Sequence, residues 1–338
     1  MSDSTFVHDG TQFRRIRKIF INDGVAPWRT VRNTWVKDND GTWKLVYVNT
    51  FFYTETISTN TNRYSLNNAL TAAGWNGTDH VDATVTISPG VTVYSSVTGT
   101  AAFRVNPALP SLSSVTLINQ GTIVGKAGAG GAGGDVAFPG TTDAGSNGLG
   151  GGQGIRVLSP ITINNTGGVI AGGGGGGGGG GSARNTGTNP KVSTGTIVGG
   201  SGGGGGGGSP LSVGAAGAAG TATLTPSPTV IIEADNGTAG NAGTTSGGAL
   251  RPGVTNPWSP GSPASSSTGG SGAAGGARGA AGGTGGTSST SGTASVSPPT
   301  VTTTAGGSGG AAGAAINGDS LVTLPAPQTG TINGPRIN

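Results

Sequence analysis

The chain has 338 residues, of which 73 are glycine and 19 are proline, and its formal net charge is +4. This glycine and proline content is typical of low-complexity segments, and the absence of cysteine excludes a disulfide framework, a cysteine-based zinc site and thiol catalysis. Only 8 of the glycines precede residue 125, whereas 8 of the 17 basic residues lie in the first 50 positions. We therefore expect three domains, over residues 1–50, 51–124 and 125–338.

The first 50 residues contain a repeat in which Phe13, Trp28 and Trp43 are spaced 15 positions apart. Each repeat has an Asp-Gly turn signal between aromatic and β-branched residues, which predicts a β-meander of about four strands. Such a small sheet cannot bury both of its faces. Its basic residues alternate with acids and aromatics, which favours a protein partner over nucleic acid. We predict that Phe13, Trp28, Trp35 and Trp43 attach the protein to that partner.

Residues 51–124 have the pattern of a small mixed α/β connector. The stretch "YSLNNALTAAGW" predicts one short helix that Ser65 caps and Gly74 ends, with Leu66 and Leu70 on its apolar face. Strand-like runs follow this helix. Two of the runs, "VTLINQGTIVG" (115–125) and "ITINNTGGVIAG" (161–172), resemble each other, and both lead directly into a glycine tract. The glycine tracts therefore begin from strands.

The glycine tracts after residue 125 have a period of three, as in Gly125, Gly128, Gly131 and Gly134. Prolines are nearly absent from the tracts and cluster between them, which argues against collagen. A period of three matches a left-handed helix of the polyproline-II type, and several such helices can bond to one another only when packed as a bundle. We predict a C-terminal packed polyglycine-II helix sandwich in a chain that is otherwise mostly irregular and β. A flexible linker and a glycine-rich β-solenoid are the alternatives.

The segments between the tracts hold most of the arginine, lysine, asparagine and aromatic residues of this region. Loops on a rigid scaffold commonly carry binding residues, and Trp, Tyr and Arg are frequent anchors. The candidates for binding are Trp258, Arg251, Asn256, Asn185, Asn189 and Lys191. The alternative is that these segments are plain connections and that Trp258 packs as a lid on the glycine helices.

Catalytic and metal-binding patterns are weak. His8 and His80 lie far apart without ligand spacing, and "GAGGAG" (128–133) has no strand–helix context that would make it a nucleotide site. We therefore expect no enzyme activity, no cofactor and no metal. There is no apolar stretch of 18 residues and no signal peptide, so we expect no membrane insertion and release by a route such as a virus particle.

The phrases "YSLNNALTAAGWNGTDHVDATVTISPGVTVYSS", "SVTLINQGTIVGKAGAGGAGGD" and "ITINNTGGVIAGGGGGGGGGG" resemble the glycine-rich receptor-binding proteins of tailed bacteriophages. These include adhesins at the tips of T-even-like long tail fibres and glycine-rich fibre proteins of siphophages. The resemblance covers roughly residues 60–335 and leaves out the N-terminal repeat.

The resemblance implies a polyglycine-helix sandwich with receptor-binding loops at its tip, in the distal tail or tail fibre of a virion. The expected partners are a bacterial outer-surface receptor, with an outer-membrane protein favoured over polysaccharide, and other phage tail or fibre proteins through residues 1–50. The alternatives are a structural tail or fibre cap and an ice-binding glycine bundle.

Overall fold

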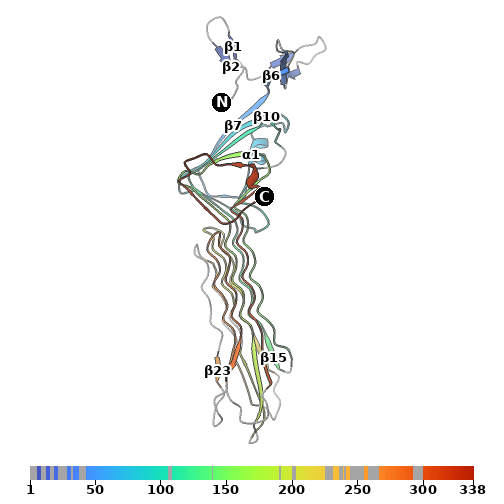
Figure 1. Ribbon diagram of the computed structural model, residues 1–338, viewed down its shortest axis with the longest axis vertical. Coiled ribbons are helices and arrows are strands. Elements are labelled where there is room, and N and C mark those ends of the chain that lie inside the picture. Colours follow the sequence, from blue (N-terminus) through green and yellow to red (C-terminus); the bar gives the residue numbers. More distant parts are fainter. Residues whose placement is uncertain are drawn as a thin grey trace.

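The computed structural model describes residues 6–8, 13–15, 19–21, 29–31, 33–37, 43–105, 109–138, 140–189, 192–199, 203–224, 231–235, 239, 241–243, 255–257, 266–291 and 300–338. The described part is elongated (Figure 1). Short strands lie at one end, three small sheets follow, and long tracts run from these sheets to the opposite end. The structure is mostly strand and irregular backbone with very little helix, as predicted.

The N-terminal strands pair as three separate hairpins. β1 (Phe6–His8) pairs with β2 (Phe13–Arg15), β3 (Ile19–Ile21) with β4 (Arg29–Val31), and β5 (Asn33–Lys37) with β6 (Trp43–Val48), all antiparallel. Each predicted Asp-Gly turn lies between two paired strands, so the hairpin prediction is confirmed. The prediction of one meander is wrong for the described strands, because they pair only in twos and form three separate two-stranded sheets.

Three parallel five-stranded sheets form the centre of the molecule. The first contains β7 (Thr50–Ile57), β10 (His80–Ile87), β13 (Ser114–Asn119), β17 (Ile161–Asn164) and β28 (Val322–Thr323). The second contains β8 (Thr61–Asn62), β11 (Thr92–Tyr94), β14 (Thr122–Val124), β18 (Val169–Ala171) and β29 (Thr331–Asn333). The third contains β9 (Tyr64–Ser65), β12 (Phe103–Val105), β16 (Ile155–Val157), β27 (Ile316–Asn317) and β30 (Arg336–Ile337).

The chain visits these sheets in the same order five times, so the sheets are the three sides of a parallel β-solenoid. Along β10 every second side chain is buried, and Val85 and Ile87 have no exposed surface. These residues meet the equivalent side chains of the next coils, such as Leu117 and Ile163, in one core. This alternation of buried and half-exposed residues is expected for a sheet that has one face on the core and the other facing solvent.

The similarity between residues 115–125 and 161–172 has a direct structural explanation. The two segments lie in adjacent coils, in register, with Leu117 beside Ile163 and Ile123 beside Ile170. At the corner between their sheets, the buried Asn119 side chain donates to Asn165 Oδ1 at 2.7 Å. The sequence therefore repeats because neighbouring coils stack like on like.

The predicted helix is α1 (Leu66–Ala72), which follows β9 directly. Leu66 and Leu70 are fully buried in the solenoid core, and Gly74 adopts the positive φ of +93° that ends a helix. Ser65 occupies the N-cap position as predicted, but its side chain makes no capping hydrogen bond. Strands before and after residue 125 share all three sheets, and the division into domains at residues 50 and 124 stays a prediction.

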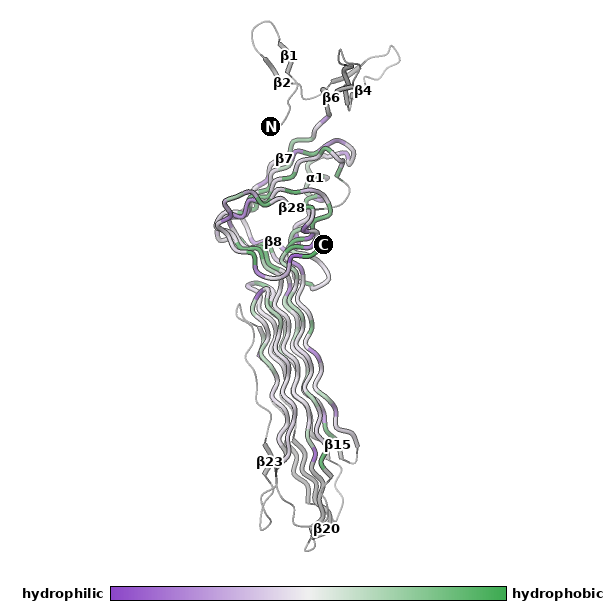
Figure 2. The backbone as a smooth tube through the Cα atoms, in the orientation of Figure 1, coloured by the Kyte–Doolittle hydropathy of each residue, from purple (hydrophilic) through white to green (hydrophobic). Residues whose placement is uncertain are grey.

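The glycine tracts are two insertions into the solenoid, both between its second and third sheets. In the third coil, residues 125–154 connect β14 to β16. In the fourth coil, residues 172–315 connect β18 to β27. Both insertions run as extended tracts along the long axis, and Figure 2 shows these tracts mostly pale while stronger greens gather in the solenoid. The solenoid therefore holds both ends of each insertion.

The ten glycines 172–181 form the centre of the bundle of tracts and are all buried. Their N–H groups turn to a different neighbour at each residue and return to the same neighbour at every third one. The tracts that accept these bonds are 143–154, 203–208 and 280–288, and the tracts that donate to their carbonyls are 125–134, 269–277 and 304–315. Gly176, for example, donates to Leu149 O at 2.9 Å and accepts from Gly310 N at 2.7 Å. Six tracts thus surround the central one.

Glycine is required in this tract because neighbouring backbones occupy the space of a side chain. A Cβ on Gly176 would lie 1.8 Å from Ala129 O, and one on Gly178 would lie 1.8 Å from Gly307 O. The second glycine run, 203–208, is also buried and bonds to the tracts on its sides. By contrast, a Cβ on Gly150, in an outer tract, would lie 3.7 Å from its nearest neighbour, Ala311 O, which is an ordinary van der Waals contact. Uninterrupted glycine therefore marks the interior tracts.

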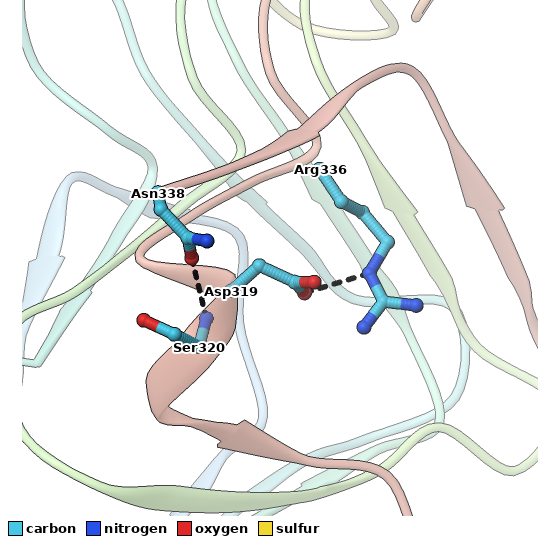
Figure 3. Close-up of polar contacts among 4 residues, drawn as sticks. All are labelled: Asp319, Ser320, Arg336 and Asn338. Carbon is cyan, nitrogen blue, oxygen red and sulfur yellow. Dashed lines mark hydrogen bonds and ion pairs between the residues drawn. The ribbon is translucent and has the colours of Figure 1, made fainter.

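The last coil closes the solenoid after both insertions. The strands β28, β29 and β30 pair in parallel with β17, β18 and β27. Beside this coil, Arg336 Nε donates to Asp319 Oδ1 at 2.7 Å and Ser320 N donates to Asn338 Oδ1 at 2.6 Å (Figure 3). Asn333 O accepts from Gly172 N, so the closing coil also contacts the base of the central tract.

We predict that Gly176→Ala lowers the free energy of unfolding by about 3 kcal/mol, because the added Cβ overlaps the Ala129 carbonyl, which a hydrogen bond from Leu149 N holds in place. Denaturant unfolding of the purified chain measures this change. Gly150→Ala is the matched control, since its Cβ makes an ordinary contact, and it should leave the stability within about 0.5 kcal/mol of the parent. Equal stability of the two variants would contradict the tract packing.

Candidate functional site

The far ends of the tracts carry a group of short strands, well separated from the solenoid (Figure 1). β19 (Ala183–Asn189), β20 (Val192–Gly199), β22 (Ile231–Asp235) and β26 (Thr300–Thr303) form one sheet. β23 (Thr255–Pro257), β24 (Ser266–Thr268) and β25 (Ser289–Ser291) form a second, and β15 (Val136–Phe138) and β21 (Ala222–Leu224) form a third. The three sheets contact one another, with β20 meeting β15, β23 and β24. We call this group of strands the distal tip.

A cluster of hydroxyls joins the tracts to the distal tip. Ser288 Oγ donates to Ser182 O at 2.6 Å, and Thr304 Oγ1 donates to Ser182 O and to Asp143 O, each at 2.9 Å. Ser182 and Ser288 are buried. The four residues lie at the ends of four different tracts, where the three-residue hydrogen-bond pattern stops. These carbonyls also accept backbone N–H groups, from Thr304 to Ser182 O and from Ser182 to Asp143 O, so the hydroxyls add further hydrogen bonds at the ends of the pattern.

Two further side chains fix the strands at the edge of the distal tip. Asp135 Oδ1 accepts from both the N–H and the hydroxyl of Thr221, at 2.7 and 2.9 Å. Arg184 in β19 donates from Nη1 to Gly140 O at 2.6 Å. These bonds connect the first insertion to the second, so the distal tip is built from both insertions.

Sequence reasoning missed these residues because none belongs to a recognised motif. One signal could have found the hydroxyl positions, since each pure glycine run ends in serine, at Ser182 and at Ser209. Ser209 is also buried, and its hydroxyl donates to Gly125 O at 3.1 Å at the solenoid end of the tracts. Nearby, Lys126 Nζ donates to Val213 O at 2.6 Å, and burial lowers the pKa of this amine.

The structure places three of the predicted binding residues on strands of the distal tip. Asn185 and Asn189 lie in β19, and Asn256 lies in β23. β19 contacts β24, which pairs with β23, so these residues share one end of the molecule. Trp258, Arg251 and Lys191 lie outside the described residues. Their roles in binding stay predictions.

Three of the four predicted attachment residues lie at the opposite end. Phe13, Trp35 and Trp43 belong to β2, β5 and β6, and Trp28 lies outside the described residues. β6 is followed after one residue by β7, so the hairpins connect directly to the first coil of the solenoid. The attachment role of these four aromatics also stays a prediction.

Titratable groups are few and dispersed. Burial raises the pKa of Tyr53 to about 12, helped by its hydrogen bond to Glu55, and burial lowers the pKa of His80. Among the described residues, no group of three His, Cys, Asp or Glu could hold a metal ion. In the same part of the chain, no helix has the length and apolar character needed to cross a bilayer.

Residues 52–337 match the family described as phage tail fibre adhesin Gp38. The chain belongs to this phage adhesin family. The match extends from β7 to β30, so it covers the solenoid and both glycine insertions and leaves out the N-terminal hairpins. Neither the search of curated proteins nor the search of solved structures gave a match.

Membership of this family places the adhesin in the tail or the tail fibre of a virion. An adhesin acts in host recognition, so its partners are a host surface receptor and the tail proteins that carry it. Proteins of this kind are structural and not catalytic. The recognition of the family from the glycine-rich phrases is therefore confirmed.

We predict that Ser288→Ala combined with Thr304→Val lowers the free energy of unfolding by about 2 kcal/mol, because each lost hydrogen bond contributes about 1 kcal/mol. Equilibrium unfolding in urea measures the change. Ser308→Ala, on an exposed part of the same tract, is the control and should have no effect, since only the backbone of Ser308 is hydrogen-bonded. A double variant as stable as this control would rule out a stabilising role for the hydroxyl cluster.

Proposed function

We propose that the adhesin binds a receptor on the host surface with the loops of its distal tip, and that the glycine tracts hold these loops as a polyglycine-II sandwich. The observation that carries the proposal is the position of the insertions. Both leave the solenoid between the same two sheets, and both reach the far end before they turn. Loops presented on a rigid support lose little entropy when they bind.

Two features support the polyglycine-II sandwich. The hydrogen bonds of the central tract repeat every three residues, as expected for a helix with three residues per turn. Some of the six neighbouring tracts run parallel to the central tract and others run antiparallel to it. A helix that bonds to neighbours on all sides can accept both directions. With a rise of about 3.1 Å per residue, ten residues carry a loop about 31 Å from the solenoid.

We further propose that the receptor is an outer-membrane protein in preference to a polysaccharide. Sugar rings are commonly held against aromatic faces, whereas the chain after residue 125 contains one Trp, one Phe and no Tyr. The segments of the distal tip instead offer strand edges and prolines, as in β23 with Pro257. Extended segments of this kind suit main-chain pairing with a protein loop.

We predict that Trp258→Ala reduces binding to host cells at least tenfold, which corresponds to about 1.4 kcal/mol, without changing the thermal stability. Binding of the purified adhesin to cells, measured by fluorescence, tests this prediction. Leu149→Ala is the control, because Leu149 is 60% exposed on the side of a tract and far from the distal tip. A fall in melting temperature with unchanged binding would instead favour Trp258 as a lid. Unchanged binding after removal of the tip segments would favour a structural cap.

The N-terminal hairpins are proposed to attach the adhesin to the particle. We predict that Trp28→Ala combined with Trp43→Ala reduces incorporation into virions, because aromatic residues dominate interface cores. Incorporation is measured by quantifying the adhesin in purified particles. The melting temperature of the variant chain should stay that of the parent. Normal incorporation of the double variant would exclude this attachment.

A further inference from the structure

Two arginines lie side by side on the third sheet of the solenoid. The register of β12 and β16 pairs Arg104 with Arg156, between the pairs Phe103–Ile155 and Val105–Val157. These flanking side chains are fully buried, so the two arginines lie on the opposite face of the sheet, towards the solvent. Adjacent strands are about 4.8 Å apart, so the two positively charged side chains start from neighbouring positions on one face of the sheet.

Nothing in the described chain neutralises this pair. Neither Arg104 nor Arg156 forms an ion pair or a hydrogen bond with another described residue, and Arg104 Nε is shielded from solvent without an acceptor. Like charges placed opposite each other destabilise a sheet. The carboxylate of Asp319, two residues beyond β27, is bonded to Arg336. The pair therefore costs stability in the isolated chain.

The residues on either side of the pair are also hydrogen-bond donors. In the same row across the sheet, Ser65 lies beside Arg104 and Asn317 beside Arg156. The Ser65 hydroxyl is buried and has no hydrogen-bond partner in the described chain. A row of hydroxyl, two guanidinium groups and an amide fits an oxyanion, and arginine binds carboxylate through two parallel hydrogen bonds.

We propose that Arg104 and Arg156 form a docking site for acidic side chains of the virion protein that carries the adhesin. Acidic side chains are the expected partner because their negative charge complements the two guanidinium groups. The position of the third sheet also favours it, because the solenoid adjoins the N-terminal hairpins and lies away from the distal tip (Figure 1). This inference rests on the proposed function, in which the distal tip contacts the host.

The test adds purified adhesin to particles that lack it and measures incorporation at 50 and 300 mM salt. Arg104→Gln combined with Arg156→Gln should reduce incorporation at least tenfold at low salt and weaken its salt dependence, because the charge attraction is lost. The melting temperature should stay the same or rise, since the like-charge contact is removed. Arg278→Gln, in the turn between two glycine tracts, is the control and should behave as the parent.

Binding of the same purified variants to host cells separates this proposal from the proposed function. The double variant should bind cells as the parent does, because its distal tip is unchanged. Normal incorporation of the double variant would overturn the docking site. If the double variant is incorporated normally but no longer binds cells, or vesicles containing lipopolysaccharide, then the anionic partner of the two arginines lies on the host surface instead. Failure of the parent itself to bind cells would reject the proposed function and leave the incorporation result intact.

Discussion

The structure depends on the hydrogen bonds that the backbone groups of the central glycine tract form with neighbouring tracts on all sides. A β-strand exhausts its N–H and C=O groups within one sheet, whereas the central tract distributes them over six neighbours. Such packing removes all space for a side chain, as the 1.8 Å approach of Ala129 O to a Cβ on Gly176 shows. The cost in conformational freedom, which is greatest for glycine, is met by pairing nearly every polar group of the interior.

The tracts cannot set their own register, because identical glycines pair equally well after a shift of three residues. The solenoid provides the register. The strands β14 and β18 start two of the tracts from adjacent positions in one sheet, and β16 and β27 receive the returning chain in the next sheet. At the far ends the side chains of Ser182, Ser288 and Thr304 fix the last carbonyls. The register of the glycine tracts is thus fixed at both of their ends.

This architecture separates two tasks in space. The solenoid adjoins the N-terminal hairpins and carries Arg104 and Arg156, which have no ion-pair partner among the described residues and which we propose contact the rest of the particle. The distal tip is assembled from segments far apart in the sequence and lies at the other end. The glycine tracts bond to one another through backbone groups, so their packing does not draw on the side chains of the tip segments.

The sequence by itself determined the family, the hairpins at the Asp-Gly turns, the helix from Leu66 to Ala72 and the anchoring of the glycine tracts by strands, because these follow from local patterns. Only the tertiary structure decided that residues 50–337 form one solenoid with two insertions, since strands of two or three residues such as β9 and β30 have no readable period. The pairing of Arg104 with Arg156 and the meeting of Ser182 with Thr304 were equally hidden. Residues so far apart in the chain become neighbours only when the coils stack and the tracts return.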